Sequence, residues 1–177
     1  MQVSLIVSVV GPDRPGLVDQ IATVVQKAGG NWEGSRLVRL AGQFAGMIQV
    51  VIHESLLPQL EEGLRRLESV GLRVASLHSD KASATAEENT THQLEVVGQD
   101  QSGIVSTISH ALAEEGVNVI ELATDVVDAP MTGERLFQTS ARLHLPATIE
   151  ATKLRARIEE IASDLMVELN RKVDSNP

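Results

Sequence analysis

Gly11-Pro12-Asp13-Arg14-Pro15-Gly16-Leu17-Val18 is the stretch from which the rest of the sequence can be interpreted. It follows an apolar run and precedes a run of apolar residues at helical spacing, from Leu17 to Ala28. The pattern returns 87 positions later as Gly98-Gln99-Asp100-Gln101-Ser102-Gly103-Ile104-Val105, in the same setting. A strand, a G-x-D-x-x-G loop and a helix are therefore encoded twice, which predicts two copies of one small domain.

The first copy predicts the element order β-α-β-β-α-β. Val3 to Val10 alternates as a strand does, and Pro15 suits the first turn of the helix that follows. The other expected elements are strands at 32–40, 44–53 and 72–78, and an amphipathic helix carrying Leu57, Leu60, Leu64 and Leu67. This order is that of the ferredoxin-like split unit, an α+β fold.

The same order is predicted again after a linker. Residues 80–91 are small and polar and have no apolar period, as linkers do. The expected elements of the second copy are a strand from His92, a helix from Ile104, hairpin strands at 117–128 and 134–145, a helix over 149–165 and a strand at 166–171. We therefore expect domains at 1–79 and 92–173, joined by the linker.

Composition excludes several classes of protein. The chain has 177 residues, and a hydrophobic content of 42% excludes wholesale disorder. Aromatic residues make up only 2%, so the cores are expected to be aliphatic, and the lack of cysteine excludes disulfides and thiolate chemistry. The first residues lack the features of a signal peptide, and the apolar runs are too short to span a membrane. A cytoplasmic protein with no membrane partner is expected.

The charge distribution argues against direct nucleic-acid binding. The net charge is −9, and all of it arises after Thr85, where sixteen acidic residues face seven basic ones. Such a surface repels phosphate backbones. RNA-recognition domains of related topology stack bases on sheet aromatics, but this chain has no tyrosine and few other aromatics.

No motif predicts an enzyme. The sequence contains no G-x-S-x-G, H-E-x-x-H or G-x-x-x-x-G-K-[ST] pattern. Its five histidines have no metal-ligand spacing and are best explained as surface or strand-end residues; they are His53, His78, His92, His110 and His144. We therefore predict no catalytic residue, no cofactor and no metal.

The duplicated loop has chemistry that suits a zwitterion. A loop that leads into a helix presents unpaired N–H groups and the positive end of the helix dipole, which favour a carboxylate. Asp13 and Asp100 could accept a hydrogen bond from an ammonium group. Asn31 and Asn118 begin the second strand of each copy, expected at the same end of the sheet as the loop, and an amide can donate and accept.

A structural explanation of the same residues stays open. An aspartate before a helix is commonly a cap, and an asparagine after a glycine is often part of a turn. The repeated glycines and apolar positions could be requirements of the fold. These residues by themselves leave ligand binding and a purely structural role as alternatives.

The motifs also resemble a known family. Asp13-Arg14-Pro15-Gly16-Leu17-Val18 resembles the D-R-P-G core of the ACT domain, a small-molecule-sensing module. Asn31-Trp32-Glu33-Gly34-Ser35-Arg36-Leu37 resembles the N-x-E-x-S-R-L segment of the glycine cleavage system transcriptional repressor group, whose members carry two ACT domains and no enzyme. The resemblance covers about residues 3 to 172.

The resemblance implies amino-acid binding where two ACT units meet, with glycine or serine as the expected ligand. The residues it points to are Asp13, Arg14, Gly16, Leu17 and Asn31, with Asp100, Gly103, Ile104 and Asn118 in the second copy. It also implies a protein partner, a DNA-binding activator, rather than contact with DNA, and a homodimer is compatible with it.

The second loop departs from the family pattern. Gln101-Ser102 stands where the first loop has Arg14-Pro15, so a preset φ and a positive charge are lost. The two loops are therefore not expected to be equivalent. Two hypotheses follow: a regulatory amino-acid sensor, or a ligand-free module that docks a protein partner.

Overall fold

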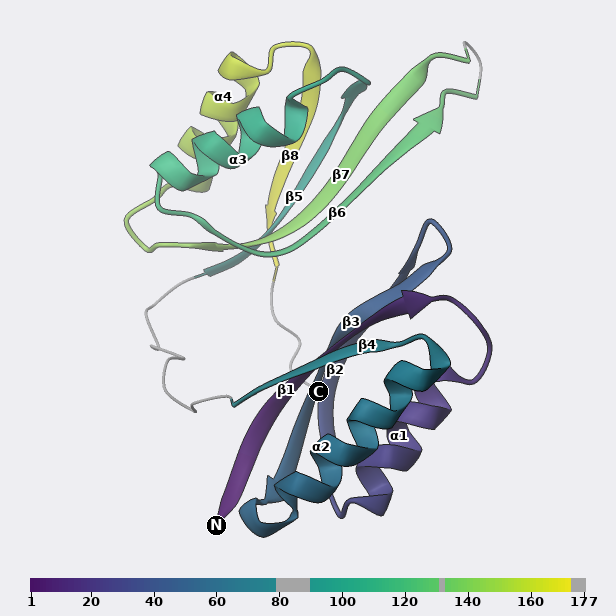
Figure 1. The fold of residues 1–177 in the computed structure, drawn as a ribbon. Helices are drawn as coiled ribbons and strands as arrows, with labels where there is room; N and C mark the ends of the chain where they lie inside the picture. The colour runs from purple at the N-terminus through teal and green to yellow at the C-terminus, as the bar shows by residue number, and fades with distance from the viewer. Residues whose placement is uncertain (79–89, 131–132, 173–177) are drawn as a thin grey trace. The chain divides into compact units, whose positions relative to one another are not determined.

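The chain folds as two α+β units. A computed structural model describes residues 1–78, 90–130 and 133–172 (Figure 1). The chain divides into Met1–Thr85 and Ala86–Pro177, and each unit carries a four-stranded antiparallel sheet. The expected fold, two ferredoxin-like βαββαβ units in tandem, is confirmed. Residues 80–89 of the expected linker lie outside the described residues, so the domain limits stay a prediction.

The first unit has the expected element order. Its sheet is ordered β2-β3-β1-β4. The elements are β1 (Gln2–Pro12), α1 (Leu17–Lys27), β2 (Asn31–Leu40), β3 (Gln43–His53), α2 (Leu57–Arg66) and β4 (Arg73–His78), with short 3-10 turns at Glu54–Leu56 and Leu67–Val70. Figure 1 shows both helices on one face of the sheet.

The second unit repeats this arrangement. Its sheet is ordered β6-β7-β5-β8. The elements are β5 (Thr90–Gln99), α3 (Ile104–Glu114), β6 (Asn118–Asp128), β7 (Arg135–Leu145), α4 (Ala151–Ile161) and β8 (Leu165–Arg171). The strand expected from His92 begins two residues earlier, because Thr90 and Thr91 already pair with the end of β7.

Each unit has its own aliphatic core between the sheet and the helices. In the first, alternate residues of β1 face apolar residues of α1 and α2. The largest fully buried side chains there are Leu5, Ile21, Ile48, Ile52, Leu60 and Leu72. In the second unit, the corresponding side chains are Leu94, Leu143, Leu145, Leu154 and Ile158. The expected aliphatic character of both cores holds apart from Phe44 and Phe137, one in each core, and Trp32, which packs against the first core.

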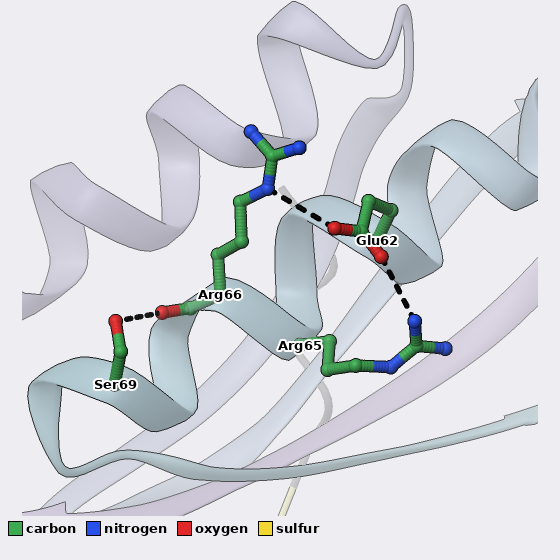
Figure 2. A network of polar contacts seen from close by, with 4 residues as sticks. All are labelled: Glu62, Arg65, Arg66 and Ser69. Atoms are coloured by element: carbon green, nitrogen blue, oxygen red, sulfur yellow. Dashed lines mark hydrogen bonds and ion pairs between the residues drawn. The ribbon is translucent and has the colours of Figure 1, made fainter.

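The outer face of α2 is charged, as its sequence pattern predicts. Figure 2 shows Glu62 accepting from Arg65 Nη1 at 2.8 Å and from Arg66 Nε at 3.2 Å. One turn later Ser69 Oγ donates to the Arg66 carbonyl at 2.7 Å. These i,i+3 and i,i+4 pairs support the helix weakly because they are exposed to solvent.

β2 and β6, each at one edge of its sheet, carry a β-bulge near their first residues. The pairing of β2 with β3 shifts between Trp32 and Gly34, and that of β6 with β7 shifts between Val119 and Glu121. The extra residue in each strand has no partner across the ladder. The bulge is thus a feature that both units share.

The β2–β3 hairpin turns through two residues with positive φ. Ala41 has φ 47° and Gly42 has φ 77°. Positive φ at both central residues is the geometry whose twist matches that of the flanking strands. This turn lies beside the loop that connects β1 to α1, because the Asp13 N–H donates to the Gly42 carbonyl at 2.9 Å.

Candidate ligand-binding loops

The first loop joins β1 to α1 and ends in an uncapped helix. Gly16 is the N-cap residue of α1, with φ 87° and ψ 2°, and no side chain caps the helix. Asp13 is therefore not a helix cap, which removes one structural explanation of its presence. The amides of the first turn are left without a side-chain acceptor, as a carboxylate-binding site requires.

Asp13 instead ties its loop to the neighbouring hairpin. Its carboxylate Oδ2 lies 2.8 Å from Nε of Arg39, near the end of β2. The Arg39 side chain is 72% exposed and that of Asp13 is 30% exposed. An ion pair this open to water contributes about 0–1 kcal/mol, so another cation could displace the guanidinium at little cost.

In the second loop the corresponding aspartate, Asp100, also pairs with an arginine of the neighbouring hairpin, but that arginine lies at a different position. The Asp100 N–H donates to the Arg135 carbonyl at 3.0 Å, and Asp100 Oδ2 lies 3.6 Å from Arg135 Nη2. In strand register Arg135 corresponds to Gly42, because each lies two residues before the phenylalanine opposite Gly11 or Gly98. The backbone bond is therefore the same in both units, while the cation comes from β7 here and from β2 in the first unit.

Arg14 is committed to a neighbouring carbonyl in the first unit. Its Nη2 donates to the Val70 carbonyl at 2.8 Å, which links the loop to the 3-10 turn after α2. Within the described residues Gln101, its counterpart, makes no such bond. The two loops therefore differ in anchoring as well as in sequence.

The glycine and apolar members of the predicted site have structural roles. Gly16 and Gly103 have φ of 87° and 98°, a region that side chains with a Cβ rarely adopt. The side chains of Leu17 and Ile104 are buried in the cores. Only the backbone of these four residues could contact a ligand.

The prediction that the asparagines lie at the loop end of each sheet is wrong. Asn31 pairs with Val51, which pairs with Ser4 near the start of β1, whereas the loop follows the other end of β1. Asn118 pairs with His144 and so lies beside Thr91 at the start of β5. The helix between the two strands returns the chain to the opposite end, so neither asparagine meets the loop of its own unit.

The structure therefore brings together only part of each predicted site. Asp13, Arg14, Gly16 and Leu17 share the first loop, and Asp100, Gly103 and Ile104 share the second. Asn31 and Asn118 are exposed, and their side chains make no hydrogen bond within the described residues. Each loop offers helix amides and a carboxylate, which together could bind the two ends of an amino acid.

Two arginines near the loops were missed by sequence reasoning. Arg39 and Arg135 pair with the loop aspartates, and both lie on hairpins that flank the loops. Strand register could have indicated only that the hairpin lies beside the loop, since the end of β1 pairs with the start of β3. No signal in the residues themselves marks these arginines.

Comparison with known proteins identifies the fold of the first unit. The sequence model of the ACT domain family matches residues 4–75. The first unit is an ACT domain. The second unit repeats its strand order, its loop and the position of its bulge, so the chain carries two units of ACT fold in tandem. ACT domains typically bind small amino acids and mediate oligomerisation.

Two solved structures resemble nearly the whole tandem. An unknown protein from Galdieria sulphuraria is 28% identical with a TM-score of 0.81, covering 98% of this chain and 100% of its own. A protein provisionally assigned as a glycine cleavage system transcriptional repressor is 18% identical with a TM-score of 0.70, covering 98% and 99%. The second likeness is one of fold. No curated protein matches the sequence.

The described part of the chain contains neither a candidate metal cluster nor a candidate membrane-spanning helix. Over residues 1–78, 90–130 and 133–172, no group of three or more histidine, aspartate or glutamate side chains is placed to hold a metal ion. In the same residues no helix has the length and apolar content needed to cross a membrane.

Proposed function

We propose that this ACT protein is a regulatory sensor of a small amino acid, glycine or serine, that acts through a protein partner such as a DNA-binding activator. The observation that carries the proposal is the duplicated loop, in which an uncapped helix start lies beside a weakly paired aspartate. The similarity of the whole tandem to a provisionally assigned repressor of the glycine cleavage system supports the regulatory role.

The geometry favours a site shared by two copies of the chain. Asp13 and Asn31 lie at opposite ends of one sheet, so one unit cannot bring both to a ligand. β2 is an edge strand. If the β2 edges of two copies paired antiparallel, the first residue of one strand would lie beside the last residue of the other. Asn31 of one copy would then approach the Asp13 loop of its partner.

In the proposed complex the loop would make two contacts with the ligand, one at each of its charged ends. The ligand carboxylate accepts hydrogen bonds from the first-turn amides of α1, and its ammonium replaces Arg39 as the partner of Asp13. A ligand held by both copies stabilises their pairing by mass action. The balance between paired and unpaired copies then becomes the signal that a protein partner detects.

Calorimetric titration of the full chain with glycine and with serine tests the proposal. We expect heat from one of them, and at least tenfold weaker binding for Asp13→Asn and for Asn31→Ala. Glu61→Gln is the matched control because it also removes one negative charge, from an exposed position on α2 that belongs to neither the loop nor β2. Sedimentation with and without ligand reports whether copies pair.

Two results would count against this function. No heat from any of the common amino acids would remove the sensor role. Weaker binding for Asp13→Asn with unchanged binding for Asn31→Ala would retain a sensor but reject the shared site.

A docking module is the second candidate, and the open sheet face of the first unit favours it. Three aliphatic side chains on that sheet are strongly exposed: Val38 by 57%, Leu40 by 69% and Leu77 by 69%. Exposed apolar patches often mark protein contacts. Partner binding that persists unchanged in Asp13→Asn, with no amino acid bound by the wild type, would favour this function.

A further inference from the structure

The second unit has an apolar groove between its first helix and its edge strand. The groove has a volume of about 150 Å³ and lies between α3, β6 and the inner strands of the sheet. It is lined by Leu94, Val105, Ile108, Ser109, Leu112, Val119, Leu122, Phe137, Thr139 and Ala141. None of the nine predicted binding residues is among them, although Val105 and Val119 directly follow two of these residues, Ile104 and Asn118.

In the first unit larger side chains stand at two of the positions that line the groove. Val119 corresponds in register to Trp32, since each lies opposite the residue six positions after the core phenylalanine. Ala141 corresponds to Ile48 by the same count, four positions after that phenylalanine. Trp32 packs against the first core, and Ile48 is fully buried in it. At these two positions the second unit has the smaller side chain, whereas Leu122 and Thr139 of its lining are larger than Ser35 and Gly46, which lie at the same register in the first unit.

The floor of the groove is closed and its mouth is open. Ile108 and Leu112 are buried, whereas Val119 is 38% exposed and Leu122 is 48% exposed at the rim. A small molecule can therefore enter without unfolding the unit. Filling the groove would cover apolar surface that the chain alone leaves in water.

The lining residues offer no hydrogen-bond or ion-pair partner to a charged ligand group. Apart from the exposed Ser109, the polar side chain in the lining is Thr139, whose hydroxyl already donates to the Ala123 carbonyl at 3.0 Å. An ammonium or carboxylate placed here would lose its hydration without a partner. The occupant is therefore uncharged, which distinguishes it from a free amino acid.

We propose that this groove binds a small uncharged aromatic molecule of the size of benzene to indole. Trp32 indicates the chemistry, because this indole ring lies at the register position of Val119 in the first unit and packs against its core. The size agrees with an engineered cavity of about 150 Å³, lined by leucine, isoleucine and phenylalanine, that binds benzene in another protein.

Titration of the full chain with benzene, followed by methyl-detected NMR, tests this inference. We expect saturable shifts at the methyl groups that line the groove, among them those of Leu112, Val119 and Leu122, with the methyl groups of the first unit unmoved. Ala141→Ile should weaken benzene binding at least tenfold, because it restores the side chain that fills the first unit. Val119→Trp should do the same through the other filling position.

A matched change in the first unit completes the test. Trp32→Val should create a benzene site there, with new shifts in that unit. Shifts that persist in both filling variants, or that spread equally over both units of the wild type, would overturn the inference. If one filling variant fails to fold, the other decides, and the methyl spectrum without benzene reports folding directly.

Discussion

Gly11 and Gly98 lie where another segment of the chain approaches the backbone closely. A Cβ at Gly11 would clash with the Gly71 carbonyl oxygen and lie 3.1 Å from Cδ2 of Leu72. A Cβ at Gly98 would clash with Leu165 in the equivalent place. These first glycines of the repeated loop are therefore required by packing, whereas Gly16 and Gly103 are required by their positive φ.

Substitution of Gly11 measures this close approach. We expect Gly11→Ala to lower the free energy of unfolding of the first unit by about 1–3 kcal/mol, since a backbone carbonyl cannot move aside as a side chain can. Denaturant unfolding provides the measurement. Gly34→Ala is the control, because its Cβ would meet only Gln49 Oε1 at 3.8 Å. An equal loss in both variants would contradict the packing explanation.

At the scale of elements, the β2–β3 hairpin combines a favourable turn with an unfavourable residue. Ala41 adopts φ 47°, a conformation that costs an alanine about 1–2 kcal/mol and that asparagine tolerates better. We therefore expect Ala41→Asn to raise the free energy of unfolding by roughly 0.5–1 kcal/mol, measured by thermal or denaturant unfolding.

The companion substitution isolates the backbone contribution. No atom lies within 4 Å of a Cβ built at Gly42, whose φ is 77°. Gly42→Ala should therefore destabilise the protein by about 1 kcal/mol through backbone strain alone. A stabilising effect of Gly42→Ala would show that the turn can change its conformation.

The order of strands and helices could be predicted from the sequence, but the end of the sheet at which β2 begins was predicted wrongly. Repeated apolar periods and glycine stops indicated every strand and helix that the structure describes. The error concerned Asn31, which was placed near the loop because both flank the same helix. A helix that connects two parallel strands of one sheet must carry the chain back along the length of the sheet, so the loop that precedes α1 and the start of β2 lie at opposite ends of the strands.

Side-chain partners were beyond the sequence for a different reason. Asp13 pairs with Arg39, but Asp100 pairs with Arg135, which occupies another position on its hairpin. Matching the two copies residue by residue would have missed this change. The apolar groove was hidden similarly, because its lining comes from α3 and from three strands that lie far apart in the sequence.

At the scale of the whole molecule, the two separate cores predict separate unfolding. Trp32 is the chain's single tryptophan and packs against the first core, so its fluorescence reports that unit. We expect Gly11→Ala to shift the denaturation midpoint seen by fluorescence and Gly98→Ala to leave it unchanged. Far-UV circular dichroism should detect both changes.

Gly11→Ala and Gly98→Ala serve as controls for each other, because each glycine has the same structural setting in its own unit. Equal shifts of the tryptophan midpoint would show instead that the chain unfolds in one cooperative step.

The bulges in β2 and β6 have a consequence for mutational scans of these strands. Past the unpaired residue, the side chains that point toward the helices change from even to odd positions in β2, and from odd to even positions in β6. A scan of β2 should accordingly find that the two-residue rhythm of tolerance to polar substitution breaks at Glu33, whereas β6, all of whose residues are exposed, should show a weaker rhythm. Libraries of β2 designed on unbroken alternation would randomise the inner positions and preserve the outer ones along most of the strand.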